Sequence, residues 1–211
     1  MNATTFSLTL DDGNRSLAAA AGSVTLLTGP VGSGKSLWLE RLAGLKPLPA
    51  GISCTLAGKP WPDKKSSAAV RLLPDLQPPI FLGQTLAEEL AFGLPAEPAA
   101  ERLQAVLGSW GLAGLPLSGN VRNLNRLEAL RLLLAGMELA APGLALLDNP
   151  TASLPADEAQ KLCAEIRDWA ARGNLVVVVA CNRWQDWQPW AGQIWRLASA
   201  DTLPATEVAH G

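Results

Sequence analysis

Residues 29–36 read GPVGSGKS, and they stand between the apolar run VTLL at residues 24–27 and the run LWLERL at residues 37–42. This order predicts a strand, a glycine-rich turn and a helix. The pattern G-x-x-x-x-G-K-S is typical of a phosphate-binding loop, in which backbone N–H groups surround phosphate oxygens at a helix N-terminus. The alternative is a glycine-rich turn that binds no ligand. The complete match in a strand-to-helix context favours phosphate binding.

The loop residues have distinct expected roles. Lys35 is expected to reach the β and γ phosphates of a nucleotide as a point charge, and the Ser36 hydroxyl is expected to ligate Mg²⁺. The nucleotide-binding residues expected from the loop are Gly29, Pro30, Val31, Gly32, Ser33, Gly34, Lys35 and Ser36.

Composition limits the other function classes. The chain of 211 residues has 17 basic and 19 acidic residues, so no overall field favours nucleic acid or an anionic membrane. Cys54, Cys163 and Cys181 form no C-x-x-C pair, and we expect buried thiols in a reducing compartment. No apolar run is long enough to span a bilayer, and residues 1–9 lack the features of a signal peptide. We therefore expect a cytosolic protein without direct membrane insertion.

Alternating strand and helix patterns predict an α/β fold with a mainly parallel sheet covered on both faces. An edge strand is expected at residues 5–10. Further strands are expected at residues 23–28, 52–56, 69–73, 144–147, 175–180 and 193–197, and helices at residues 35–45, 99–110, 126–139 and 156–171.

The middle of the chain has a helical character. Thr85 can cap a helix, and Glu88 stands three residues later as in a capping box. We expect one domain over residues 1–211, with a P-loop NTPase core (RecA-like) over residues 1–84 and 128–211. A helical lobe is expected as an insertion over residues 85–127.

The order of these features resembles the ATP-binding subunit of an ABC transporter, over nearly the whole chain. The loop at residues 29–36 is one basis of the resemblance. The segment QPPIFLGQT at residues 77–85 is similar to the family's Q-loop, and PGLALLDNPT at residues 142–151 is similar to its Walker B strand. The resemblance implies an α/β core with an inserted helical subdomain of the ABC ATPase type, ATP and Mg²⁺ as ligands, and transmembrane subunits as partners.

The resemblance also implies roles for single residues. Asp148 would be the Walker B carboxylate, and Gln77 would sense the metal and contact the membrane subunit. Ser36, Gln77 and Asp148 are thus the expected metal-site residues. Gln77 can also be an ordinary loop residue. An acid such as Asp148 at the end of a buried strand is costly unless a metal or donor meets it.

Positions tied to hydrolysis depart from the family pattern. Asn149 replaces the glutamate that follows the Walker B aspartate, and an amide cannot accept a proton from water. Loss of a general base costs roughly a hundred- to ten-thousandfold in rate. Cys181 replaces the switch histidine, and a thiol is a weak donor; a small buried hydrophobe is the simpler interpretation. Pro155 replaces the D-loop aspartate.

The signature motif also differs from the family pattern. The family spacing back from Pro142 places it at residues 124–128, LNRLE, where Arg126 and Leu127 replace glycines that permit a close phosphate approach. Arg126 can instead offer a cation to phosphate or remain solvated. LSGNV at residues 117–121 looks more similar but lies seven residues upstream, which fits only if the next helix is longer. Phe6 is the nearby candidate for the aromatic that stacks on adenine.

These departures give the functional hypothesis. The chain is expected to bind Mg-ATP but to hydrolyse it poorly, as one subunit of a transporter with a second, competent ABC ATPase. Alternatives are an active ATPase with unusual catalytic groups and a nucleotide-free platform for a membrane protein. Trp184, Trp187 and Trp190 recur at every third residue and predict cover for the sheet, or alternatively a partner surface.

Overall fold

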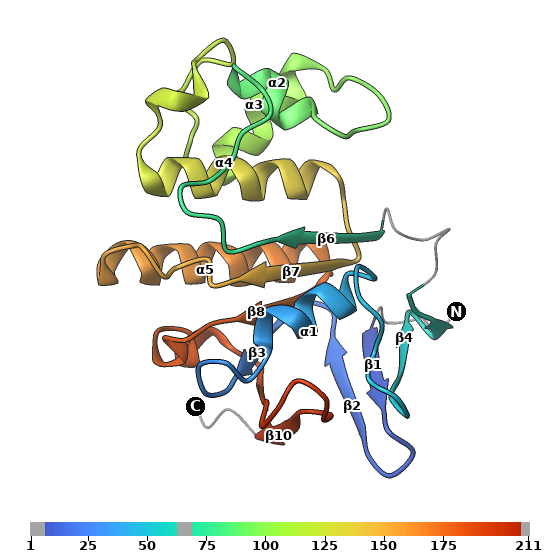
Figure 1. Cartoon of the computed structure of the whole chain (residues 1–211). Coiled ribbons are helices and arrows are strands. Elements are labelled where there is room, and N and C mark those ends of the chain that lie inside the picture. Colours follow the sequence, from blue (N-terminus) through green and yellow to red (C-terminus); the bar gives the residue numbers. More distant parts are fainter. Residues whose placement is uncertain (1–6, 63–68, 208–211) are drawn as a thin grey trace. The chain divides into compact units, whose positions relative to one another are not determined.

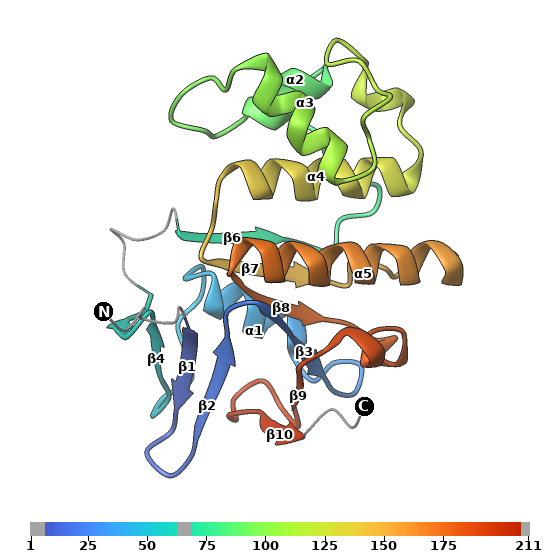
Figure 2. The same cartoon turned by 180° about the vertical axis from the view of Figure 1, so that it is seen from behind.

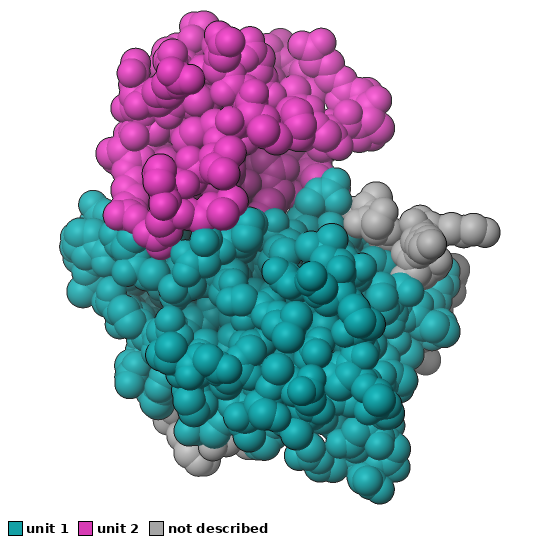
Figure 3. All heavy atoms as spheres, viewed as in Figure 1, with its two compact units in different colours: residues 1–75, 142–211 teal, residues 76–141 magenta. Residues whose placement is uncertain are grey.

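The computed structural model describes residues 7–62 and 69–207, which divide into two compact units. One unit comprises Met1–Asp75 and Pro142–Gly211, and the other comprises Leu76–Ala141 (Figure 3). The second unit is wider than the lobe expected over residues 85–127. It takes in all of helix α4, Arg126–Leu139, because α4 packs against the other helices of that unit.

The first unit contains a mainly parallel sheet. Among the described residues its strand order is β10-β9-β3-β8-β7-β6. All its strand pairs are parallel except β9 with β10. The expected α/β fold is thus confirmed. The strands are β3 Ser23–Thr28, β6 Val70–Leu73, β7 Leu144–Asp148, β8 Val176–Ala180, β9 Gln193–Arg196 and β10 Ala205–Glu207.

A second, antiparallel sheet has the order β2-β1-β4-β5. Its strands are β1 Ser7–Asp11, β2 Ser16–Ala20, β4 Ser53–Leu56 and β5 Lys59–Pro60. The expectation of an edge strand near residues 5–10 was wrong, because β1 pairs with both β2 and β4. Strand β2 was not predicted, since its sequence SLAAA is rich in alanine, which is depleted in strands.

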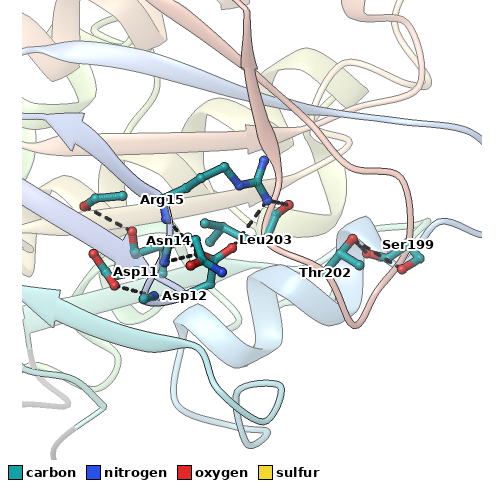
Figure 4. A network of polar contacts seen from close by, with 10 residues as sticks. Asp11, Asp12, Asn14, Arg15, Ser199, Thr202 and Leu203 are labelled. Atoms are coloured by element: carbon teal, nitrogen blue, oxygen red, sulfur yellow. Dashed lines mark hydrogen bonds and ion pairs between the residues drawn. The ribbon is translucent and has the colours of Figure 1, made fainter.

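The turn between β1 and β2 is held by aspartate side chains (Figure 4). Asp11 accepts a hydrogen bond from the Gly13 N–H, and Asp12 accepts from the N–H groups of Asn14 and Arg15. The Arg15 guanidinium then donates to the Leu203 carbonyl oxygen at 3.3 Å. This contact joins the hairpin to the segment that follows β9.

Helices cover both faces of the parallel sheet (Figures 1 and 2). Helix α1, Lys35–Leu42, contacts β7 and β8, and helix α5, Ala156–Gly173, contacts β3. Alternate residues of each strand face opposite sides. On the α1 side, one buried cluster combines both sheets with α1, and it includes Leu8, Leu10, Trp38, Leu39, Leu144, Leu146, Val176 and Val178. The two sheets and α1 therefore share a hydrophobic core that fixes the position of the loop before α1.

The second unit is helical. Its helices are α2 Leu86–Ala91, α3 Ala100–Ser109, the 3₁₀ helix η2 Val121–Asn123, and α4. The predicted capping box of Thr85 and Glu88 is confirmed at α2. Asn125 and Glu128 form a second capping box, so α4 begins at Arg126. Inside this unit, Trp110 Nε1 donates to Glu138 Oε2 at 2.6 Å. In the described ranges 7–62 and 69–207, no helix has the length and apolar character needed to cross a membrane.

Candidate nucleotide-binding site

The glycine-rich loop joins β3 to α1, as the sequence predicted. Gly29 and Gly34 have φ angles of 155° and 93°. A Cβ on Gly29 would lie 2.4 Å from the Leu197 carbonyl oxygen, and one on Gly34 would lie 2.5 Å from Ala200 Cβ. The chain after β9 thus packs so closely on the loop that larger residues do not fit at these two positions.

Lys35 is the first residue of α1 and is only 9% exposed. Its Nζ donates hydrogen bonds to the carbonyl oxygens of Gly29 at 2.9 Å and Pro30 at 3.1 Å. Burial lowers the pKa of Lys35, while the neighbouring Cys181 and Asp148 act in the opposite direction. The loop therefore holds a cationic donor against its own backbone, next to the acid at the end of β7.

Asp148 ends strand β7. Burial raises the pKa of its carboxyl, and the hydrogen bond with the Ser36 side chain and the Lys35 charge oppose this effect. The negative charges of Asp75 and Glu40 raise the pKa further. A cation or further donors near such an acid would favour its carboxylate form.

A pocket of about 310 Å³ lies beside the loop. It brings together the ends of β3, β7 and β8, which are adjacent in the parallel sheet, so the predicted Lys35, Ser36 and Asp148 share one space. The carbonyl oxygens of Gly29 and Pro30 accept hydrogen bonds from Lys35, and Ser33 is buried. The pocket is lined by Val31, Gly32, Gly34, Lys35, Ser36, Asp75, Asp148, Asn149, Cys181 and Asn182.

Asn149 has a left-handed backbone conformation, with φ of 53°. Its N–H donates to the Ala180 carbonyl oxygen at 2.7 Å, which anchors the residue to the end of β8. Its side-chain Nδ2 donates to Asp75 Oδ2 at 3.0 Å. The residue that follows Asp148 is thus an amide that is engaged with a carboxylate.

Asp75 was missed by sequence analysis. It follows Pro74 just after β6, and β6 pairs with β7 in parallel. Carboxyl ends of neighbouring parallel strands meet at one edge of a sheet, and this edge is where ligands bind in α/β folds. An acid two residues beyond a predicted strand was therefore the signal that could have identified Asp75.

Cys181 follows β8 and is 2% exposed. Burial raises its pKa to about 12, although the positive charge of Lys35 opposes this effect. The thiol is therefore un-ionised at neutral pH. It borders the pocket as a weakly polar group and does not act as a base.

Gln77 belongs to the second unit, where its side chain accepts a hydrogen bond from the Arg126 guanidinium. Arg126 opens α4, so residues 124–128 do lie at a helix start. The stretch 117–121 ends at the first residue of η2, Val121, and α4 is not extended toward it. Phe6 lies outside the described residues. Pro155 precedes α5 as its N-cap residue and supplies no side-chain hydrogen bond there.

The tryptophans after β8 pack on the first unit itself. Trp187 is buried and its Nε1 donates to Thr151 Oγ1 at 3.2 Å. Trp190 donates to Gln160 Oε1 at 2.9 Å and lies 4.9 Å from the guanidinium of Arg167, both on α5. These contacts agree with a covering role.

The oxygen donors of the pocket fit a hard divalent cation. The Ser36 hydroxyl and the carboxylates of Asp148 and Asp75 line one space, and oxygen ligands of this kind suit Mg²⁺. The buried ammonium of Lys35 and the α1 N-terminus suit phosphate. The residues present therefore fit Mg²⁺ together with a phosphorylated ligand.

Comparison with known proteins identifies the family. A profile described as ABC transporter matches residues 13–152. The chain belongs to the ABC transporter family. The energy-coupling factor transporter ATP-binding protein EcfA1 of Lactiplantibacillus plantarum is 31% identical over 81% of this chain and 62% of its own length. The Fe(3+) ions import ATP-binding protein FbpC of Streptomyces coelicolor is 33% identical over 77% of this chain and 48% of its own length. The chain thus spans only part of the length of these ABC transporter relatives.

Solved structures share the fold of this ABC family member. CbiO1 from Clostridium perfringens, described as part of the ABC transporter complex cbiONQ, superposes with a TM-score of 0.84 at 14% identity. The superposition covers 97% of this chain and 89% of cbiO1. A nucleotide-free ATP-binding cassette from an ABC transporter superposes with a TM-score of 0.79 at 16% identity, over 97% of this chain and 92% of that one. These likenesses establish the ABC ATPase fold.

Proposed function

We propose that this chain is an ATP-binding subunit of an ABC transporter that binds Mg-ATP but hydrolyses it poorly. The observation that carries the proposal is the set of residues that line the pocket beside the loop. Lys35, Ser36 and Asp148 face it as groups for phosphate and cation, while Asn149 and Cys181 border it where water activation is required.

Asn149 and Cys181 fail as bases for different physical reasons. The Asn149 amide has no basic group, and its Nδ2 is a donor to Asp75. The pKa of Cys181 is raised to about 12 by burial, so the thiol neither accepts a proton from water nor carries charge at neutral pH. A missing general base lowers the rate by roughly a hundred- to ten-thousandfold.

The start of α4 supports an asymmetric assembly. A phosphate approaching a helix N-terminus needs small residues there, but Arg126 opens α4 and its guanidinium is engaged with Gln77. In the head-to-tail dimer implied by the family, each site combines one chain's loop with the other chain's signature. A homodimer would have two altered sites, whereas a competent second ATPase would supply one intact signature and one intact base. We infer a heterodimer on transmembrane subunits, at the cytoplasmic face of the membrane.

Gln77 keeps its proposed role as a residue that couples the site to the membrane subunit. Its Arg126 contact links the segment before α2 to the start of α4 inside the second unit. This hydrogen bond ties the two segments together. The transmembrane partners and ATP are proposals for this chain on the basis of relatives named as transporter ATP-binding proteins.

The decisive experiment is the native mass of the complex purified from its own membranes with Mg-ATP. We expect membrane-spanning chains and a different ATP-binding subunit next to this chain. A homodimer on membrane chains, or a lone chain, would contradict the heterodimer. Mg-ATP binding to the purified chain, with turnover at least about a hundredfold below that of the partner, tests the separation of binding from hydrolysis. Turnover equal to that of the partner would refute it.

A further inference from the structure

The post-β9 segment, residues 197–203, lies against the glycine-rich loop. A Cβ on Gly34 would lie 2.5 Å from Ala200 Cβ and 3.0 Å from Ala200 Cα. A Cβ on Gly29 would lie 2.4 Å from the Leu197 carbonyl oxygen. The segment therefore packs on the loop at its first residue and again at the residue that precedes α1.

The post-β9 segment is buried at its two ends and mostly exposed between them. Leu197 and Leu203 are 0% and 5% exposed and belong to the core cluster. The Leu197 N–H donates to the Thr28 carbonyl oxygen at 2.8 Å, and Arg15 donates to the Leu203 carbonyl oxygen at the other end (Figure 4). Residues 198–202 lie largely in the open between these anchors. The core thus fixes the ends, and the position of the middle depends on other contacts.

Arg41 of α1 contacts this exposed middle. Its Nη1 donates to the Ala200 carbonyl oxygen at 2.5 Å, and its Nη2 donates to Asp201 Oδ1 at 3.1 Å. The Arg41 side chain is only 11% exposed, and its guanidinium lies 5.9 Å from the ring of the buried Trp38, within cation–π range. Gly34 and Arg41 are separated by about two helical turns, so they lie on the same side of α1. Ala200 thus faces Gly34 with its Cβ and Arg41 with its carbonyl oxygen.

We propose that Arg41 is a positioning residue for the glycine-rich loop, which holds the post-β9 segment against Gly34 and so fixes the loop conformation that lines the pocket. The inference rests on the proposed function for the identity of the ligand. Among the described residues, no side chain caps the N-terminus of α1, and glycine by itself adopts many backbone conformations. A loop that leaves its binding conformation must be ordered again when the ligand binds. Arg41 reduces that cost from outside the pocket.

The two acceptors of Arg41 differ in importance. Asp201 is 82% exposed, and an ion pair with such a residue contributes little. The hydrogen bond to the Ala200 carbonyl oxygen is charge-assisted and partly buried, so it is the stronger contact. The backbone contact is therefore the one that positions the loop.

The first measurement is the Mg-ATP affinity of the full chain, by titration calorimetry. We expect Arg41→Ala to lower the affinity by about tenfold, the cost of fixing roughly one more loop residue on binding. Arg41→Lys should stay within about threefold of wild type, because an ammonium group can still donate to the Ala200 carbonyl oxygen. Asp201→Asn should stay within about twofold, because only the exposed ion pair is lost.

Ala200→Gly tests the same contact without changing α1 or the core cluster. It removes the Cβ that faces Gly34, and we expect an affinity about threefold below that of wild type. Combined with Arg41→Ala, it should lower the affinity by less than the product of the two single effects, because both variants loosen one contact.

The second measurement is hydrogen–deuterium exchange of the chain without nucleotide, read by mass spectrometry. In Arg41→Ala we expect peptides from residues 29–36 to exchange at least about threefold faster, because the loop opens locally. Peptides from β7 and β8 should keep the wild-type rate. A merely structural role of Arg41 would instead raise exchange throughout the first unit.

Arg102→Ala is the matched control. Arg102 lies on α3 in the second unit, and its Nη2 donates to the Leu139 carbonyl oxygen at 3.3 Å. The variant thus removes the same kind of contact, a helix arginine that donates to a backbone carbonyl. We expect it to change neither the Mg-ATP affinity nor the exchange of residues 29–36.

The results separate this inference from the proposed function. Wild-type Mg-ATP binding that Arg41→Ala leaves unchanged would overturn the positioning role alone. Faster exchange throughout the first unit, or wild-type exchange of residues 29–36 in Arg41→Ala, would overturn it as well. If the wild-type chain binds no Mg-ATP while Arg41→Ala still speeds exchange of the loop alone, the proposed function is wrong and Arg41 keeps its hold on the loop.

Discussion

The loop side and the strand-end side of the pocket differ in what their groups can do. On the loop side, Lys35 and Ser36 sit at the start of α1 with the donors that phosphate and a cation require. On the strand-end side, Asn149 and Cys181 follow β7 and β8 and offer no base at neutral pH. Both sides rest on the same parallel sheet. The proposed function therefore separates ligand binding from water activation within one folded core.

The loop side and the strand-end side of the pocket are built on buried strands of the same sheet. Strands β7 and β8 are buried along the sheet, and the residues that differ from the family pattern come immediately after them. Asn149 and Cys181 are therefore outside the two strands themselves. In the proposed function, the strand-end side lacks a base while the loop side keeps its geometry. The predictions below test each side, from the largest expected effect to the smallest.

The thiol of the strand-end side gives the largest effect. Burial raises the pKa of Cys181 to about 12, and it also raises the pKa of Cys54 to about 12 and that of Cys163. At pH 8 such a thiol is on the order of a thousandfold less ionised than an ordinary cysteine. We expect iodoacetamide to alkylate Cys181 at least that much more slowly in the folded chain than in urea, with a rate that rises about tenfold per pH unit up to pH 11. Mass spectrometry measures the alkylation rates. Equal rates in the folded chain and in urea would mean that Cys181 is a reactive thiolate in the folded chain.

Lys35→Ala tests the loop side. The substitution removes charge-assisted hydrogen bonds to phosphate, each worth about 1.5–3 kcal/mol. We expect Mg-ATP affinity to fall by roughly ten- to a hundredfold, as measured by titration calorimetry, at an unchanged fold. Lys161→Ala is the control, because Lys161 is an exposed residue 4.0 Å from Asp157 and outside the pocket. Undiminished binding by Lys35→Ala would mean that the loop does not hold the phosphates.

The variant Asn149→Glu tests whether one substitution on the strand-end side restores ATP hydrolysis. We expect turnover to rise by less than about tenfold, although a general base commonly contributes roughly a hundred- to ten-thousandfold. Cys181 and the α4 start remain altered, and the new carboxylate faces Asp75. The double variant with Asp75→Gln should have a higher turnover than Asn149→Glu alone, because it removes the repulsion between the new glutamate and Asp75. Steady-state phosphate release measures the turnover of both variants. If Asn149→Glu alone reached the turnover of an intact ABC ATPase, the hypothesis that several altered positions limit hydrolysis would be wrong.

The smallest expected effect is a change in the thermal stability of the chain caused by Asp148→Asn. Burial raises the pKa of the folded-state carboxyl above its ordinary value of 3.8, so the folded state binds the proton more tightly than the unfolded state. Stability is therefore lost as pH rises through the folded pKa. At pH 7 the amide avoids this cost, and we expect the thermal midpoint without ligand to rise by about a few degrees. The gain should vanish near pH 3, and a lower midpoint at pH 7 would contradict the sign.

Local patterns made much of the fold predictable. The strand from Ser23 to Thr28, the loop that follows it and the start of α1 were all expected where they occur, because glycine requirements and helix capping act over a few residues. The capping box at Thr85 followed from the same kind of short-range rule. The position of Asp148 at a strand end was also readable, since the apolar run before it is uninterrupted.

Strand pairing was not readable to the same degree. Strand β1 pairs with β2 and with the distant β4, and β10 adds an antiparallel edge to β9. Alternation in the residues of β1 indicates a strand but contains no information about its neighbours. Partners depend on which apolar faces meet in the shared core, which is a property of the whole unit.

The sequence by itself determined the glycine-rich loop, the position of Asp148 at a strand end and the amide that follows it at Asn149, because each depends on a short run of residues. Only the tertiary structure decided that Asp75 meets Asn149 and that Ala200 closes on Gly34. Those partners lie far apart along the chain, and their contact depends on strand order and packing in three dimensions. A motif gives the chemical groups of a site, and the packed sheet decides which of them face the same space.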